Sequence, residues 1–265
     1  MDLEKVGKNA FRDSGLSEVA FSPILKSIGE TAFQGNSIKA VVLPDTVTSL
    51  GRGAFATNPK LEKIDLPNNL SEIPDSAFGC SDNKNWMTGL TSVDIPASVK
   101  KIGARAFAGN NFTDIKVPKG VTELGDYAFA TKNYLLKEAP ICNLELPEGL
   151  TAIGKYAFRN KKVAEVKLPA TVTALPKNVF AKEITSASGK TEKYDLVTKV
   201  YVDDISKYGD AGKFPKSEFH KILSADINVW NAEDFTYADV DLDSNNSPAP
   251  AQDNMNVITG KIRVV

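Results

Sequence analysis

The sequence lacks several features on which whole classes of function depend. It has a single histidine, His220, and only two cysteines, Cys80 and Cys142, in 265 residues, which disfavours histidine-based catalysis, zinc binding and a disulfide scaffold. It has no run of about eighteen apolar residues, so no membrane-spanning segment is predicted. Its 32 basic and 33 acidic side chains give a net charge of −1, without the basic excess that would favour a nucleic-acid partner.

The N-terminal residues also lack the basic and then apolar pattern of a secretion signal. Met1 is followed at once by Asp2, Leu3 and Glu4. Residues 3–11 match only the second half of the repeat that fills the following sequence, so we expect the chain to be a monomeric fragment of a larger protein.

A 22-residue repeat dominates the sequence. Its clearest mark is an apolar residue followed by phenylalanine, and most successive phenylalanines of this kind are 22 residues apart. They are Phe11, Phe33, Phe55, Phe78, Phe107, Phe129, Phe158 and Phe180. A fixed period of this length predicts a repeat architecture before any local structure is considered.

A proline preceded by an apolar residue gives each repeat a second fixed point. Counted from this proline, apolar residues recur at −6, −3, −1, +3, +6 and +11, and glycine or proline at +7 predicts a turn. The −3 to −1 segment alternates like a strand that the proline ends. The prolines are Pro44, Pro67, Pro96, Pro118, Pro147 and Pro169.

One such unit cannot cover its own apolar residues. We therefore expect the units to stack into a solenoid whose backbones hydrogen bond from coil to coil, with the phenylalanines in a single interior column.

The pattern Leu-Pro-x-x-Val-Thr-x-Leu/Ile-Gly-x-x-Ala-Phe, seen at 43–55, 117–129 and 146–158, resembles the BspA-like (Treponema pallidum type) leucine-rich repeats. The likeness covers about residues 2–223. It implies a leucine-rich repeat solenoid of short parallel β-strands, turns and short helical segments. It also implies a bacterial surface or secreted protein, since some members of the family adhere to host proteins, matrix or other cells.

The family usually has cysteine three residues after the phenylalanine, where this chain has Asn36, Asn58 and Asn110. An asparagine at this position can bond a neighbouring backbone, so we expect a structural role for these three side chains.

The repeat pattern dissolves near residue 223. We expect residues 1–223 to form the solenoid with an irregular C-terminal cap, and residues 224–265 to form a β-like tail or the start of a further domain, partly flexible. Within this tail, residues 226–242 are strand-like, and residues 257–265 are a candidate strand to pair with them.

Three repeats carry extra residues. The insertions occur at the same point of the unit in every second repeat, so we expect them to emerge along one edge. They bring Trp86, Met87, Tyr134 and Leu135 to that edge, and exposed aromatic and methionine side chains on loops favour a binding site. Alternatively, these side chains fold back and seal the edge. The insertions are 80–89, 130–140 and 181–193.

The outward side chains of the strand segments are a second candidate for partner binding. Neighbours lie one strand spacing apart, so Lys116, Glu145 and Lys167 are expected to form an alternating charge ladder on a solvated face. Asp65 beside Asp94 could attract a cation, but calcium needs six or more oxygens and no such loop motif is present, so no metal site is predicted. The −2 position holds, among others, Asp65, Asp94, Lys116, Glu145, Lys167 and Tyr201.

Catalytic and cofactor motifs are not spelled out. Gly51–Ala56 formally matches a dinucleotide fingerprint, but the repeat already requires these residues and a 22-residue unit leaves no room for a crossover helix. Cys80 and Cys142 lie two repeats apart, so free thiols are expected. No nucleophile and base pair is evident, so we predict no enzyme and no cofactor.

Together these observations predict a non-catalytic, cell-surface or secreted recognition or adhesion module. It would bind a protein or extracellular-matrix partner through the extended surface of the solenoid, without membrane insertion; adhesion and surface location come from the resemblance alone. Two alternatives remain open. One is a structural spacer of a larger surface protein, and the other is a carbohydrate-binding module that uses Trp86, Tyr134 and Tyr194.

Overall fold

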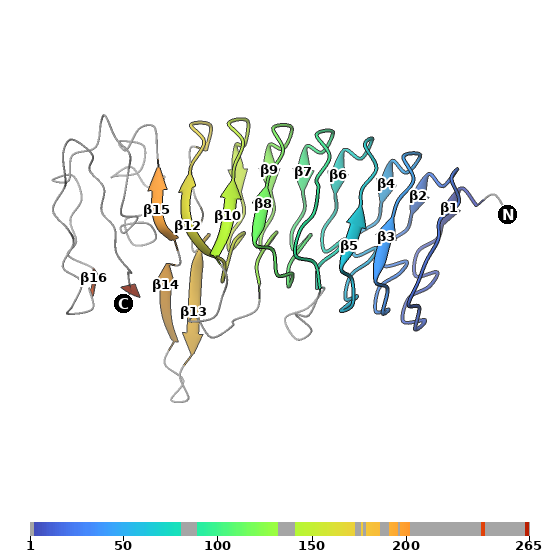
Figure 1. Ribbon diagram of the computed structural model, residues 1–265, viewed down its shortest axis with the longest axis horizontal. Helices are drawn as coiled ribbons and strands as arrows, with labels where there is room; N and C mark the ends of the chain where they lie inside the picture. The colour runs from blue at the N-terminus through green and yellow to red at the C-terminus, as the bar shows by residue number, and fades with distance from the viewer. Residues whose placement is uncertain are drawn as a thin grey trace.

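Successive coils of the chain lie side by side along one long axis, beginning at the N-terminus (Figure 1). The computed structural model describes residues 3–80, 89–131, 141–172, 176, 179–185, 191–195, 197–201, 240–241 and 263–264. Within these residues the chain is a solenoid with short parallel strands, as predicted.

One wall of the solenoid is made of two-residue strands, one in each of the coils from Phe11 to Phe158. They form a parallel sheet of β1, β2 and β4 and a second parallel sheet of β6, β7, β9 and β11. In every one of these strands the second residue is buried and the first is not. The strands are β1 (Lys5–Val6), β2 (Ser27–Ile28), β4 (Ser49–Leu50), β6 (Glu72–Ile73), β7 (Lys101–Ile102), β9 (Glu123–Leu124) and β11 (Ala152–Ile153).

The opposite wall carries the longer strands that end before the prolines. Here β3 pairs with β5, while β8, β10, β12 and β15 form a four-stranded parallel sheet. The three-residue strands run from −4 to −2, one residue earlier than predicted. The strands are β3 (Ala40–Val42), β5 (Lys63–Asp65), β8 (Asp114–Lys116), β10 (Ile141–Glu145), β12 (Lys162–Lys167) and β15 (Val197–Tyr201).

The second wall of short strands was not predicted, and the short helical segments expected between strands are turns in the described residues. Each of the seven coils from Phe11 to Phe158 turns through a residue with positive φ just before the Ala-Phe dipeptide, which interrupts any helical run. These residues, with φ of 52° to 62°, are Asn9, Thr31, Gly53, Ser76, Arg105, Tyr127 and Tyr156.

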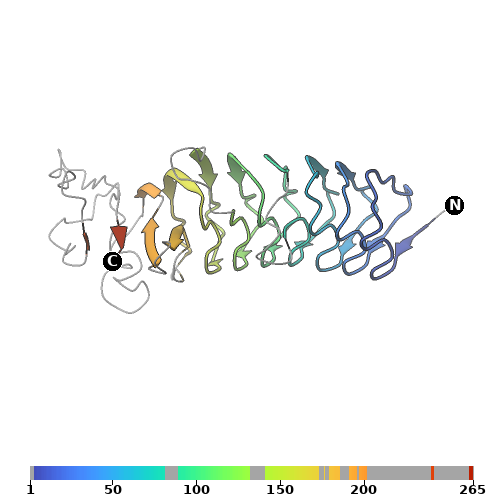
Figure 2. The ribbon, with the colours of Figure 1, turned by 90° about the horizontal axis from the view of Figure 1, so that it is seen from below.

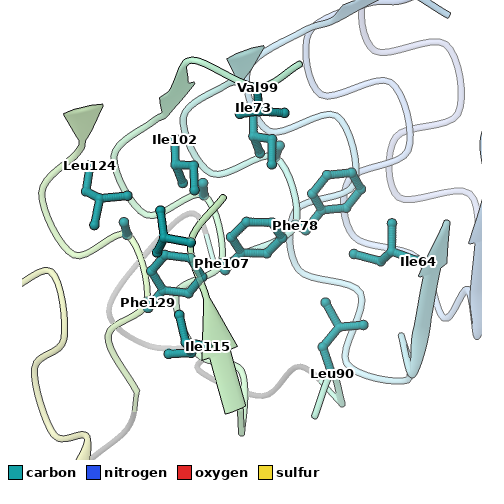
Figure 3. Packing of buried hydrophobic residues seen from close by; sticks show 14 of the residues in the cluster. Ile64, Ile73, Phe78, Leu90, Val99, Ile102, Phe107, Ile115, Leu124 and Phe129 are labelled. Carbon is teal, nitrogen blue, oxygen red and sulfur yellow. The ribbon is translucent and has the colours of Figure 1, made fainter. Parts of the chain in front are cut away.

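The core is the predicted column of phenylalanines, part of which is seen in Figure 3. Successive rings from Phe11 to Phe180 stack with centroids 5.1 to 5.8 Å apart and planes within 15° of parallel. Phe33 onward is at most 2% exposed, whereas Phe11, in the first coil, is 41% exposed. Ring stacking of this kind adds to the hydrophobic gain from burial.

Buried asparagines tie neighbouring coils together beside this column. Asn58 Nδ2 donates to the carbonyls of Phe33 at 3.0 Å and Phe55 at 2.9 Å, and its Oδ1 accepts from the Ile38 N–H at 3.2 Å. Asn36 and Asn110 repeat this arrangement in their own coils. The structural role predicted for these asparagines is therefore confirmed.

The third insertion contains a β-hairpin, β13 (Ala181–Thr185) with β14 (Thr191–Asp195), rather than an open loop. β14 also pairs with β17 (Arg263–Val264), which pairs antiparallel with β16 (Val240–Asp241). Two short parts of the C-terminal tail thus join one sheet with the hairpin. The predicted division of the chain at residue 223 stays a prediction, and the predicted cap and His220 lie outside the described residues.

Candidate interaction surfaces

The wall of longer strands presents a mixed charged surface. Lys116 and Glu145 face each other in the register of β8 and β10, and their side chains form an ion pair of 3.1 Å. This is the first step of the predicted charge ladder. The next step is different, because Lys167 pairs with Glu148 at 3.3 Å and not with Glu145. Exposed pairs of this kind add little to the stability of the fold.

The other predicted residues of this wall are spread along it. Asp65, at the end of β5, forms a 3.0 Å ion pair with Lys63 of the same strand. Asp94 is exposed in a coil that has no assigned strand at this point, and Tyr201 ends β15 opposite Lys167. Asp65 is already paired with Lys63, so its charge is compensated within its own strand, and the predicted neighbourhood of Asp65 and Asp94 stays a prediction.

The predicted insertion-edge residues Trp86, Met87, Tyr134 and Leu135 lie outside the described residues. Their role in binding stays a prediction. What the structure does show is where the first two insertions leave the coils, at Cys80 and after Thr131.

A surface that the sequence analysis missed lies beside these two points. Arg105 lies over the ring of Tyr127 at 4.9 Å, the rings of Tyr127 and Tyr156 stack at 4.8 Å, and Arg159 lies 5.3 Å from the centroid of Tyr156. We call Arg105, Tyr127, Tyr156 and Arg159 the corner column. The available signal was the residue before each Ala-Phe dipeptide, which changes from small to large along the chain.

The corner column is half-buried and packed onto the solenoid. Tyr127 contacts a small cluster of buried residues made of Cys80, Ala108 and Ala130. Burial raises the pKa of Tyr127, against the lowering effects of the Arg159 and Arg105 charges and of a hydrogen bond from Arg159. The phenol therefore stays protonated at neutral pH and keeps its hydrogen for donation to a partner.

Lys161 is a buried cation inside the solenoid. It occupies the position three residues after a phenylalanine that asparagine holds in three other coils. Its Nζ donates to the carbonyls of Asn110 and Phe112, both at 3.1 Å, and lies 5.6 Å from the Phe112 ring centroid. Burial lowers the pKa of Lys161 to about 8.

Neither thiol is a candidate nucleophile. Cys80 and Cys142 are buried and form no disulfide with each other, as expected. Burial raises the pKa of Cys142 to about 11, so its thiol is protonated and unreactive at neutral pH.

The described part of the chain contains no group of three His, Cys, Asp or Glu side chains that could hold a metal ion. Nor does it contain a helix long and apolar enough to cross a membrane.

The repeats can now be compared with known proteins. The model of the BspA type leucine-rich repeat region matches residues 4–135 and 85–187, in six copies. The chain belongs to this family. Leucine-rich repeat proteins of this kind are non-catalytic binding modules. No match was found among curated proteins.

One solved structure supports the same fold, and two others resemble this chain with lower TM-scores. A leucine-rich repeat protein from Bacteroides ovatus is 22% identical, with a TM-score of 0.54, over 78% of this chain and 50% of that protein. The chain therefore spans about half the length of this relative. A leucine-rich cell surface protein from Faecalibacterium prausnitzii is 18% identical, covering 76% of this chain and 72% of that one, with a TM-score of 0.37. The T. pallidum leucine-rich repeat protein is 20% identical and covers 77% of both chains, with a TM-score of 0.33.

Proposed function

We propose that the chain is a recognition or adhesion module of a bacterial cell-surface or secreted protein. In this role it binds a protein or extracellular-matrix partner through the outer surface of the solenoid. The observation that carries the proposal is the continuous stack of coils, in which an unbroken ring column and buried asparagines fix the backbone.

A fixed backbone favours binding because little conformational entropy is lost when a partner docks. The wall of longer strands holds its charged side chains at regular strand spacing, so a partner meets the same pattern each time. Membership in a family of binding modules supports a partner, and the cell-surface relative supports exposure to the outside of the cell.

The test is binding of the purified chain to a panel of purified extracellular-matrix proteins immobilised on a sensor surface. We expect saturable binding to at least one of them. The matched control is a Phe107→Ala variant, whose disrupted core should abolish binding without changing any surface residue. If no panel member binds the chain, and charge reversals on the strand wall leave binding unchanged as well, the chain is a spacer and the proposal is wrong.

Location is tested separately. Antibodies raised against the chain should label intact cells of the producing organism, and brief protease treatment of those cells should remove the label. Labelling that appears only after the cells are permeabilised would contradict a surface role.

A further inference from the structure

A groove of about 320 Å³ lies on the wall of two-residue strands, across β7, β9 and β11. These strands are hydrogen bonded in this order, so the groove spans neighbouring coils. Gly125 and Gly154, which carry no side chain, line it together with the buried residues Leu124 and Ile153. No comparison with known proteins assigns this groove a role.

Two alanines open the groove. Position +8 of the repeat, counted from the proline, holds a charged side chain in every coil from Phe11 to Phe158 except one, where it is Ala104. Position +5 begins each two-residue strand and is polar or charged in all of these coils except one, where it is Ala152. Both alanines line the groove, which therefore lies where each row loses a long side chain. The fold does not require alanine at either position, because other coils have lysine there: Lys8 and Lys155 at +8, and Lys5 and Lys101 at +5.

The groove carries more negative than positive charge. Asp75, Glu123 and Asp126 line it, and Lys101 is the one ammonium among its described lining residues. Lys101 is already bound to Glu123 at 2.9 Å, and the pKa of Lys101 is raised mainly by this hydrogen bond and charge, with smaller contributions from Glu72 and Asp75. Lys101 and Glu123 compensate each other, which leaves the charges of Asp75 and Asp126 in excess.

The backbone of the following coil holds these two carboxylates in place. Asp75 Oδ1 accepts a hydrogen bond from the Ala104 N–H at 2.7 Å, and Asp126 Oδ1 accepts one from the Lys155 N–H, also at 2.7 Å. In the part of the chain that the structure describes, neither carboxylate forms an ion pair. A carboxylate fixed in this way can bind a partner's cation with little loss of conformational entropy.

The spacing of the two carboxylates indicates which kind of cation fits. Asp75 and Asp126 lie two coils apart, about 10 Å by strand spacing, which is too far for both to bind one metal ion at about 2.5 Å. Alternate side chains of an extended peptide lie on one face about 7 Å apart, and the long side chains of arginine and lysine can span the difference. Their apolar stems can pack against Ala104 and Ala152.

We propose that this groove binds a basic polypeptide segment of the partner, with arginine or lysine side chains at alternate positions bonding to Asp75 and Asp126. This proposal rests on the proposed function and names the chemistry of the partner. It places the contact on the wall of two-residue strands, opposite the charged wall of longer strands.

The experiment measures fluorescence anisotropy of a labelled twelve-residue peptide of alternating arginine and glycine against the purified chain. It is done at 0.15 M salt, where exposed charges more than about 8 Å apart are largely screened. We expect saturable binding that weakens about tenfold in the Asp75→Asn/Asp126→Asn variant, because two charge-assisted contacts are lost. Asparagine keeps the Oδ1 that accepts from the next coil, so this variant should stay folded.

A second variant tests the shape of the groove without changing its charge. Ala104→Gln/Ala152→Gln fills the groove with side chains of the length that other coils carry at these positions, and it should weaken peptide binding as well. Circular dichroism and thermal unfolding confirm that each variant is folded.

The matched control is Glu62→Gln/Asp114→Asn, which removes two exposed carboxylates, one just before β5 and one in β8. This control should bind the peptide as the parent does. Equal weakening in the control, unchanged binding in either groove variant, or no binding by the parent would overturn the proposal. If spermine binds to the groove and the peptide does not, the groove takes a polyamine and the proposal of a polypeptide is wrong.

The two proposals fail in different ways. If the chain binds a matrix protein and both groove variants bind it equally well, the groove proposal is wrong and the recognition role stands. If the chain binds the basic peptide through the groove but no matrix protein, the groove proposal stands and the nature of the partner must be revised.

Discussion

At the scale of single residues, the buried asparagines show how a side chain can replace missing backbone partners. Their structural role could be predicted from the sequence because Asn36, Asn58 and Asn110 recur at one point of the repeat. The burial of Lys161 at the same point could not, because a lone lysine ordinarily indicates an exposed position. Its burial depends on a long side chain that reaches the carbonyls of Asn110 and Phe112.

Replacing Asn58 by alanine should lower the free energy of unfolding by about 3 kcal/mol, because buried carbonyls and an N–H lose their partner. Asn58 is fully buried and bonds to the backbone at Phe33, Phe55 and Ile38. Urea unfolding measures the change. Asn68→Ala, at an exposed position, is the control and should change the stability by less than about 1 kcal/mol. Similar losses in both variants would contradict the structural role of the buried asparagines.

Lys161 should make stability depend on pH. Its pKa is about 8 in the folded chain against 10.5 for the ordinary group, so between these values the unfolded chain binds more protons and stability rises with pH. Across that interval the contribution is about 3 kcal/mol. Urea unfolding at pH 7, 8, 9 and 10 should show that the parent gains stability relative to Lys161→Met. Parallel pH profiles for the two proteins would show that the pKa is not lowered.

At the scale of the repeat element, the sequence pattern correctly predicts the position of every core ring but not the reason for the glycine at +7. The repeat pattern predicts a turn at that glycine. In the structure the decisive constraint is the preceding coil, since a Cβ on Gly125 would lie 2.4 Å from the Ala104 N and 2.6 Å from the Gly103 carbonyl carbon. Contact between backbones of different coils is a tertiary property, so the pattern within one repeat does not show it.

Gly125→Ala should therefore destabilise the chain by about 2 kcal/mol through backbone displacement. Gly7, at the equivalent position of the first coil, has nothing within 4 Å of an added Cβ. Gly7→Ala should be neutral or slightly stabilising, because it only restricts the unfolded chain. Thermal unfolding of both variants distinguishes this explanation from a pure turn requirement, which would give them the same sign.

The ring column makes a second prediction at this scale. Phe107 is fully buried and stacks on Phe78 and Phe129, so Phe107→Ala should reduce stability by about 4 kcal/mol. Phe11 is 41% exposed and stacks on Phe33 alone, so Phe11→Ala should reduce it by only about 1 kcal/mol. Denaturant unfolding measures both. Equal effects would mean that the rings do not act as a continuous column.

At the scale of the whole molecule, period and apolar spacing suffice to predict a solenoid, because one unit cannot bury its own apolar residues and must stack on its neighbours. They do not predict surfaces that arise when coils meet. The corner column needs Tyr127 and Tyr156 on neighbouring coils, and the departure of Lys167 from the charge ladder follows from its pairing with Glu148. The binding role proposed for the chain depends on these assembled surfaces, and hence on one fixed register between coils. Figure 2 shows the coils following one another along the long axis.

Cysteine pairs placed on adjacent strands test that register most directly. Lys116 and Glu145 are register partners in β8 and β10, whereas Asn143 lies two residues back along β10. The Lys116→Cys/Glu145→Cys protein should form a disulfide under mild oxidation, since adjacent strands place the Cα atoms about 5 Å apart, while Lys116→Cys/Asn143→Cys should remain reduced. Peptide mapping by mass spectrometry reads out both. Equal or faster crosslinking of the 116 and 143 pair would contradict the stacked register on which the account depends.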